Sequence, residues 1–235
     1  MKLKILGSGS IFSKDNSASC LIDNKILIDV PNGTCKTLKR IEIEPSNISN
    51  ILITHFHGDH YFDIPFVLLN KISNSNESIN IYCDTSGKNK IYNLTKLAFP
   101  NKVDKINQYF KYNTNGKFNI GNYTIKKVKL DHEEGIEANG YIFIQKDTKI
   151  GFTGDTGICQ GVKIMAEECN YLICDCNSLK GKKSHIGVDD IIGIAKEYQN
   201  CTFYTTHMQT GVREKILSLN IKNLIPLYDY DEFLI

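Results

Sequence analysis

Short hydrophobic runs rich in β-branched residues recur along the first third of the chain, at residues 2–6, 19–22, 26–30 and 51–54. Each run is bounded by Gly, Asn or Asp, so the pattern predicts β-strands separated by turns. Residues 34–41 follow a Pro-Asn-Gly turn signal and have helical spacing. The chain is therefore predicted to open with three strands, a helix and a fourth strand.

The rest of the chain alternates between segments with helical spacing and segments typical of strands. Apolar spacing predicts helices over residues 62–71 and 88–99 with a strand at 79–83 between them, and then strands within 118–130 and at 141–145 and 149–153. The last third alternates helices at 162–169, 188–198 and 213–219 with strands at 171–174, 202–206 and 224–227. Two halves of this kind indicate two sheets packed together with helices outside. No linker or repeat divides the chain, so residues 1–235 are expected to form a single domain.

Composition and charge narrow the class of protein. With 41% hydrophobic and 23% charged residues, the chain can bury a core and is not a disordered protein. The net charge of +2 excludes a strongly basic nucleic-acid-binding chain. Residues 61–130 nevertheless contain 11 Lys and 4 Asp or Glu, and their aromatic residues could stack on bases: Tyr92, Phe99, Phe110, Tyr112 and Phe118. A solvated lysine surface is the alternative interpretation.

The chain carries no sign of export or of a membrane span. Its N-terminus lacks the apolar stretch of a signal peptide, and no apolar run approaches the ~20 residues that cross a bilayer. We therefore expect a cytoplasmic protein without a membrane segment. Its eight cysteines are then interpreted as buried small hydrophobic residues, with a cysteine metal site as the alternative.

The strongest chemical signal follows the strand at 51–54. Three of the six histidines, His55, His57 and His60, lie within six positions together with Asp59. A strand end followed by a glycine-containing turn can direct imidazoles and a carboxylate around one cavity, and these groups suit divalent metal ions. A solvated turn with incidental histidines is the alternative.

Further metal-binding side chains follow later strands. His132 comes after the strand-like residues 123–130, Asp155 follows the strand at 149–153, and His207 follows the strand at 202–206. Each of them alone is more often a structural residue, a turn aspartate or a satisfied histidine. Four separate strand ends that deliver His or Asp are what a metal site at one edge of a sheet sandwich requires.

These residues resemble the motifs of the metallo-β-lactamase superfamily, and within it the ribonuclease Z-like branch of phosphodiesterases. The resemblance covers nearly the whole chain. It rests on Gly-Ser-Gly-Ser at 7–10, Leu-Ile-Asp-Val at 27–30, the His-x-His-x-Asp-His loop at 55–60, His132, Thr-Gly-Asp-Thr at 153–156, His185 and His207.

The resemblance implies an α+β fold, a four-layer αββα sandwich, with two divalent ions at one edge, zinc first and manganese or iron as alternatives. By position, His55, His57 and His132 would hold one ion, Asp59, His60 and His207 the other, and Asp155 would bridge them. Asp59 would also orient a bridging hydroxide that attacks the substrate. His185 would serve the transferred phosphate or the leaving oxygen, and Asp175 would orient a ligand imidazole.

One departure limits the substrate. Bacterial ribonuclease Z has a long glycine-rich arm between the third histidine and the bridging aspartate, whereas His132 and Asp155 are only 23 positions apart here. We therefore expect a metal-dependent hydrolase, a phosphodiesterase acting on a small cyclic nucleotide, another small phosphodiester or a short RNA. A hydrolase of carbon esters, lactones or thioesters and a non-catalytic, metal-stabilised binding module are the alternatives. The family also implies a homodimer.

Overall fold

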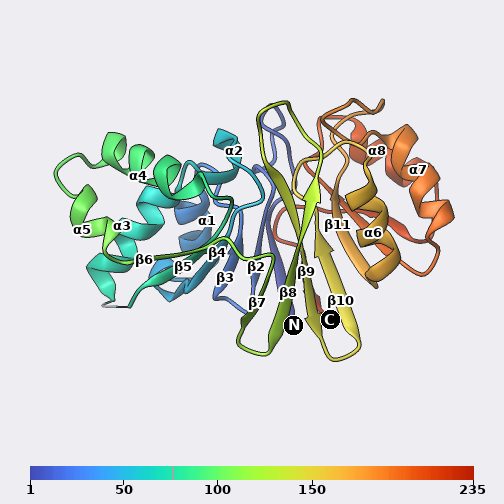
Figure 1. The fold of residues 1–235 in the computed structure, drawn as a ribbon. Helices are drawn as coiled ribbons and strands as arrows, with labels where there is room; N and C mark the ends of the chain where they lie inside the picture. The colour runs from blue at the N-terminus through green and yellow to red at the C-terminus, as the bar shows by residue number, and fades with distance from the viewer. Residues whose placement is uncertain (76) are drawn as a thin grey trace. The chain divides into compact units, whose positions relative to one another are not determined.

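The computed structural model describes residues 1–75 and 77–235. They form two compact units, and neither unit is one continuous stretch of chain. The first unit contains residues 1–6, 17–114 and 230–235, and the second contains residues 7–16 and 115–229. Each unit holds one mixed sheet, which has seven strands among the described residues (Figure 1). The single domain over residues 1–235 stays a prediction.

The first sheet has the spatial order β14-β1-β2-β3-β4-β5-β6. Strands β3 to β6 run parallel, whereas β1 pairs with β14 and β2 pairs with β3 in antiparallel fashion. The strands are β1 (Lys2–Gly7), β2 (Ser19–Ile22), β3 (Ile26–Ile28), β4 (Asn50–Leu52), β5 (Ile79–Tyr82), β6 (Phe110–Asn113) and β14 (Glu232–Leu234). The helical segments are α1 (Thr34–Arg40), the 3-10 turn η1 (Pro45–Asn47), α2 (Gly58–Tyr61), α3 (Ile64–Asn74), α4 (Gly87–Ala98) and α5 (Val103–Asn107).

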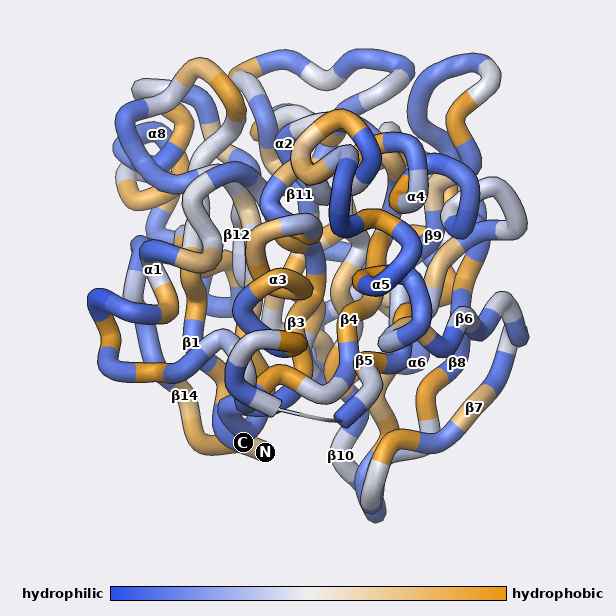
Figure 2. The backbone as a smooth tube through the Cα atoms, turned by 90° about the vertical axis from the view of Figure 1, so that its left-hand side faces the viewer, coloured by the Kyte–Doolittle hydropathy of each residue, from blue (hydrophilic) through white to orange (hydrophobic). Residues whose placement is uncertain are grey.

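Strands β3 and β4 are buried along their whole length, which explains why all of β3 and the last two residues of β4 are apolar. Figure 2 shows both largely in the hydrophobic colour. Leu27 and Ile51, from these two strands, pack in one core with Val67 of α3. The two chain ends also meet in this unit, where the ammonium group of Met1 donates a hydrogen bond to the carbonyl of Ile235 at 2.7 Å (Figure 1).

The second sheet has the order β13-β12-β11-β10-β9-β8-β7. Its strands are β7 (Lys117–Ile120), β8 (Tyr123–Leu130), β9 (Ala138–Gln145), β10 (Thr148–Phe152), β11 (Tyr171–Asp175), β12 (Thr202–Thr206) and β13 (Leu224–Pro226). Helices α6 (Gln160–Glu168), α7 (Val188–Glu197) and α8 (Val212–Ser218) lie on one side of it in Figure 1. They pack on the sheet through buried residues such as Met165, Ile191 and Ile216.

Strand direction in this second sheet determines where the site forms. Strands β10 to β13 run parallel, and β9 runs antiparallel to both β10 and β8. Consequently β8, β10, β11 and β12 all point the same way, and their carboxyl ends meet at one edge of the sheet. Such an edge is where α/β proteins commonly bind ligands.

The predicted elements are present, with differences at short segments. The strand region at 118–130 is a hairpin, because Gly121 adopts a φ of 54° between β7 and β8. Helices α2 and α5 and strands β6 and β14 were not predicted, since segments of three to five residues carry too few positions to show a period. Six of the eight cysteines are buried, as expected. No helix in the described part of the chain is both long and apolar enough to cross a bilayer.

Candidate active site

The histidine loop of the first unit begins directly after β4 and runs into α2. His57 precedes the first helical residue of α2, and Asp59 and His60 lie in its single turn. The ring of His55 lies 4.1 Å from that of His60 and 4.8 Å from that of His57, measured between centroids. His55 and His60 are buried, whereas His57 and Asp59 are partly exposed. The first unit thus brings these four predicted residues together.

Asp29 fixes the orientation of this loop from the end of the neighbouring strand β3. One carboxylate oxygen accepts the backbone N–H of Thr54 at 2.8 Å. The other accepts the Thr54 hydroxyl at 2.7 Å and Nδ1–H of His60 at 2.8 Å. Since the Thr54 hydroxyl donates its one hydrogen to Asp29, it accepts from Nδ1–H of His55 at 3.1 Å. Both imidazoles therefore carry their proton on Nδ1, which leaves Nε2 in the form that binds a metal ion.

The sequence analysis assigned no role to Asp29. Its signal was present, because it is a charged residue that ends a hydrophobic strand, within a motif already compared with the superfamily. What the sequence lacked was the parallel pairing of β3 and β4, which places Asp29 beside Thr54. A carboxylate that holds a metal-binding histidine from behind raises the basicity of that histidine and fixes its tautomer.

The second unit gathers four ionisable residues at the carboxyl ends of its strands. Asp155, Asp175, His185 and His207 each offer a ligand atom, and these atoms all lie within 4.8 Å of one another. Nε2 of His207 is 3.3 Å from Oδ2 of Asp155. Nδ1–H of His185 donates to Oδ2 of Asp175 at 2.8 Å. The prediction that later strand ends converge holds within this unit.

His132 lies beside this group. Its Nδ1 is 2.7 Å from the carbonyl oxygen of Ser184. Because a carbonyl oxygen can only accept, Nδ1 carries the proton of the neutral ring, and Nε2 keeps the lone pair that can bind a metal ion. Its ring meets that of His185 edge to face at 5.0 Å, and His185 stacks on His207 at 5.3 Å. The second unit thus brings together His132, Asp155, His185 and His207 from the predicted set.

Asp175 acts on a different imidazole from the one expected. It pairs with His185, whereas its nearest approach to the expected ligand His207 is 3.7 Å, between Oδ1 and Nδ1. Burial lowers the pKa of His185, but the hydrogen bond and charge of Asp175 and the charge of Asp155 outweigh it, so the pKa is raised. Asp175 therefore favours the protonated form of His185 in this arrangement.

Two amides complete the surroundings of His207, and no sequence motif indicates a role for either. Nδ2 of Asn177 lies 3.2 Å from Nδ1 of His207 and also donates to its carbonyl oxygen at 3.2 Å. Nε2 of Gln209 donates in turn to Oδ1 of Asn177 at 3.1 Å. These bonds hold His207 in a strained backbone conformation with φ of 58°.

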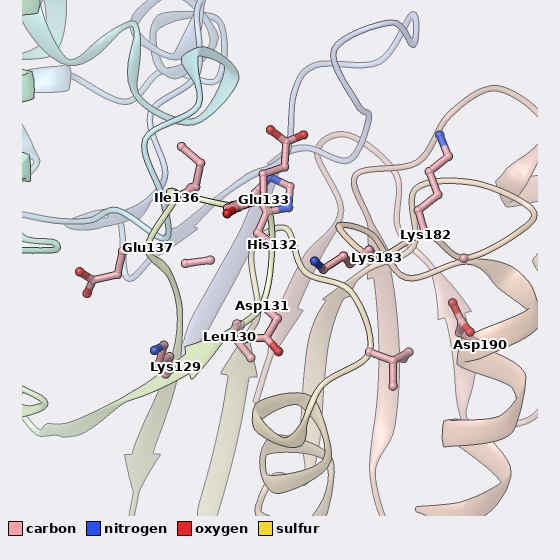
Figure 3. Close-up of a pocket in the computed structure, with 14 residues that line it drawn as sticks. Lys129, Leu130, Asp131, His132, Glu133, Ile136, Glu137, Lys182, Lys183 and Asp190 are labelled. Atoms are coloured by element: carbon pink, nitrogen blue, oxygen red, sulfur yellow. The ribbon is translucent and has the colours of Figure 1, made fainter.

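Two cavities of the second unit open beside these residues. The smaller, about 230 Å³, is lined by Ser10, Ile11, Phe12, Glu133, Asn177, Lys182, Ser184, His185, His207 and Gln209. The larger, about 750 Å³, borders His132, and Figure 3 shows Glu133 beside that histidine. Acidic side chains outnumber lysines along it: Asp131, Glu133, Glu134, Glu137 and Asp190 against Lys129, Lys182 and Lys183.

The aromatic residues of the lysine-rich segment serve mainly in packing. Phe99, Phe110 and Tyr112 pack against the core of the first unit, and Phe118 is buried in the second. The hydroxyl of Tyr92 donates to Asp104 at 3.3 Å. Four of these aromatic side chains thus contribute to packing, and their stacking on bases stays a prediction.

The donor set fits divalent metal ions in each unit considered separately. Imidazole nitrogens and carboxylate oxygens are the ligands that zinc and similar ions prefer. His55, His60 and His132 hold the required tautomer, and the cluster around Asp155 draws carboxylates and imidazoles within ligand distance of one another. Among the described residues, the candidate ligand clusters contain no cysteine, so the cysteine alternative gains no support.

Comparison with known proteins agrees with this description. Ribonuclease Z of Thermococcus gammatolerans is 24% identical over an alignment that covers 100% of this chain and 87% of the relative. The solved structure of the metallo-β-lactamase fold protein YhfI from Bacillus subtilis has a TM-score of 0.80 at 15% identity and covers 99% of this chain and 98% of its own. A diphosphatase of the PhnP family has a TM-score of 0.76 at 20% identity, covering 100% and 97%.

The fold and the clustered His and Asp residues define a ribonuclease Z-like member of the metallo-β-lactamase superfamily, a metal-dependent hydrolase that is a phosphodiesterase at the family level. The α+β metallo-β-lactamase fold predicted from the sequence is confirmed. Residues 1–226 match the family described as Anti-Pycsar protein Apyc1, and the chain belongs to that family.

Proposed function

We propose that this protein hydrolyses a small phosphodiester and that a cyclic nucleotide is the substrate class it fits best. The observation that carries the proposal is the pair His185–Asp175 beside His207, at the wall of a cavity of about 230 Å³. This cavity is small for a whole drug-sized ligand, since such sites usually span roughly 300–1,000 Å³. It suits one part of a small substrate.

Two divalent ions, zinc first, are part of the proposal. The superfamily resemblance and the donor tautomers support one ion held by His55, His57 and His132, another by Asp59, His60 and His207, and Asp155 shared between them. Ions there would neutralise charge on the phosphoryl oxygens and make water acidic enough to attack at neutral pH.

The chain's own residues then move the protons. The Asp59 carboxylate accepts a proton from the attacking water as its oxygen bonds to phosphorus. As the ester P–O bond breaks, Nε2–H of His185 donates a proton to the leaving oxygen, while Asp175 holds Nδ1–H on the far side of the ring. Phosphorus keeps its oxidation state, and one P–O bond replaces another.

Two features favour a small substrate over a long RNA. Strands β9 and β10 occupy most of the span between His132 and Asp155, so little chain remains there for a tRNA-binding arm. The larger cavity is lined by more carboxylates than lysines, and such a lining repels a phosphate backbone.

The test is a substrate screen on purified protein of measured metal content. It compares 2′,3′- and 3′,5′-cyclic nucleotides, an activated phosphodiester, a short RNA, and ester, thioester and lactone substrates. Turnover is expected on cyclic nucleotides. His185→Ala should lower kcat by about 10²- to 10⁴-fold with metal content unchanged, since general acid catalysis contributes about that much.

Lys180→Ala is the matched control, because Lys180 is an exposed lysine of the loop that carries His185, lies outside both cavities and should leave kcat unaltered. Turnover confined to esters, thioesters or lactones would replace the proposal with a carbon-ester hydrolase. A metal-loaded protein that turns over none of the substrates would point to the binding module.

A further inference from the structure

A tight turn carries two exposed apolar side chains to the small cavity. The backbone N–H of Ser13 donates to the carbonyl of Ser10 at 3.0 Å, which closes a β-turn with Ile11 and Phe12 at its centre. Phe12 is 85% exposed and Ile11 54% exposed, and both line the cavity that holds His185 and His207. Two adjacent exposed apolar side chains at the mouth of a cavity form a candidate contact surface for a ligand.

Backbone hydrogen bonds attach the turn to the segment that follows His207. The backbone N–H of Ser10 donates to the carbonyl of Met208 at 3.1 Å, and that of Met208 to the carbonyl of Ser8 at 3.1 Å. A side chain at Gly9 would place its Cβ 1.9 Å from Oγ of Ser13, so only glycine allows this close turn.

Charged side chains brace the base of the same turn. Arg213 donates to Oδ2 of Asp15 at 2.8 Å and to Oγ of Ser8 at 2.9 Å. Asp229 accepts from the Ser8 hydroxyl at 2.9 Å and from the backbone N–H of Asn16 at 2.8 Å. The backbone that carries Phe12 is therefore held at the cavity before any ligand arrives, which reduces the entropy lost on binding.

The cavity also offers polar atoms suited to a heterocycle. Oγ of Ser10 is buried and makes no hydrogen bond within the described residues, although Ser10 is only 4% exposed. The amide of Gln209 is oriented by its bond to Asn177, which turns its Oε1 away from that contact. An apolar ring face next to a buried hydroxyl without a partner and an oriented amide is chemistry that can recognise a nucleobase.

We propose that Phe12 stacks on the base of the nucleotide substrate and that the turn at residues 10–13, with Ser10 and Gln209, forms its base subsite. This inference rests on the proposed phosphodiesterase function and names the part of the substrate that the cavity holds. It makes Phe12 a specificity residue that contributes to binding rather than to bond cleavage.

The kinetic test compares Phe12→Ala with the wild type on a cyclic nucleotide and on the corresponding ribose cyclic phosphate that lacks a base. KM for the nucleotide should rise about 5- to 100-fold with kcat retained, the range expected from loss of one stacked base. KM for the substrate without a base should stay the same. Phe12→Tyr should restore nucleotide binding, since it keeps the ring.

A fluorescence titration measures binding at the subsite independently of turnover. The chain contains no tryptophan, so Phe12→Trp introduces a single indole, and its fluorescence should be quenched by a nucleoside 5′-monophosphate but not by ribose 5-phosphate. Leu217→Trp is the control, since Leu217 is a 51% exposed residue of α8 outside both cavities. Because Phe12 is exposed, none of the three Phe12 variants removes core packing.

The outcomes separate this inference from the proposed function. If the wild type cleaves no phosphodiester but Phe12→Trp is quenched by nucleotides alone, the proposed reaction fails and the base subsite stands. An equal KM change on both substrates overturns the subsite, as does the absence of nucleotide quenching. A Phe12→Ala variant that changes only the sedimentation coefficient would assign the turn to contacts between copies of the chain, and would also overturn it.

Discussion

Asp29 shows how one buried carboxylate prepares a metal site from behind. It accepts three hydrogen bonds, and one of them places the proton of His60 on Nδ1. Its bond with the Thr54 hydroxyl has the same effect on His55, because that hydroxyl then accepts from Nδ1–H of His55. The φ of Asp29, 57°, lies in the left-handed region, where Asp and Asn are tolerated better than most residues. An asparagine there keeps the backbone and removes one acceptor.

Asp29→Asn should therefore weaken metal binding about 10- to 100-fold, as loss of such a supporting carboxylate commonly does, with the fold retained. The measurement is competition for zinc with a chelator indicator, alongside circular dichroism. Asp23→Asn is the matched control, because Asp23 also has a positive φ, of 48°, but lies exposed at the turn between β2 and β3. Equal zinc affinity in Asp29→Asn and the wild type would contradict the role of Asp29 in supporting the metal-binding histidines.

At the scale of elements, three loops of the second unit pack against one another at the carboxyl ends of their strands. Gly157 follows β10, its N–H donates to the carbonyl of Asp131 after β8 at 2.8 Å, and its α-carbon faces the loop before α7. A Cβ there would lie 2.0 Å from the carbonyl oxygen of Lys183, two residues from His185. Backbone atoms cannot rotate aside, so the loop that carries His185 has to move.

Gly157→Ala should cost about 1–3 kcal/mol of unfolding free energy as an overpacking substitution. It should also lower kcat by up to about 100-fold, since a shift of 1 Å in a catalytic group can cost that much. Urea denaturation and steady-state kinetics measure the two effects. Gly116→Ala is the control, because a Cβ there meets no atom within 4 Å. Normal kcat in Gly157→Ala would show that the loop accommodates the methyl group without moving His185.

For the whole molecule, connectivity is the notable feature, because the chain passes between its two units four times. Both units contain buried cysteine thiols. Cys20 and Cys83 are buried in the first unit, and Cys169, Cys174, Cys176 and Cys201 in the second. Burial raises the pKa of Cys20 to about 12 and, together with the charges of Cys201 and Glu168, that of Cys169 to about 12.

At pH 8, only the two partly exposed thiols, Cys35 and Cys159, should react with Ellman's reagent, because the other six are buried and not accessible. Cys35 should be the slower of the two, since burial and the charge of Asp63 raise the pKa of its thiol. In increasing urea, the other six should become reactive in one transition, since neither unit is a continuous segment that could unfold while the chain of the other remains undisturbed. Mass spectrometry of labelled peptides assigns each thiol. Separate transitions for the two groups of thiols would instead establish two independent domains.

The class of fold and most of the candidate metal ligands could be predicted from the sequence alone. Hydrophobic periodicity is a local property, so the longer strands and helices could be predicted. The spacing of His55, His57, Asp59 and His60 is also local, so it indicates a ligand set without knowledge of any residue distant in the chain. His132, Asp155 and His207 could be added because each follows a strand.

The groups that support those residues, and the side chains around them, depend on how the chain folds in three dimensions. Asp29 reaches His60 because β3 and β4 pair in parallel, and Asp175 meets His185 because the loop before α7 folds back onto the end of β11. Phe12 reaches the small cavity through backbone bonds between Ser10 and Met208, which are 198 positions apart. Sheet register and loop contacts of this kind join residues distant in the chain, and no local pattern of polarity encodes them.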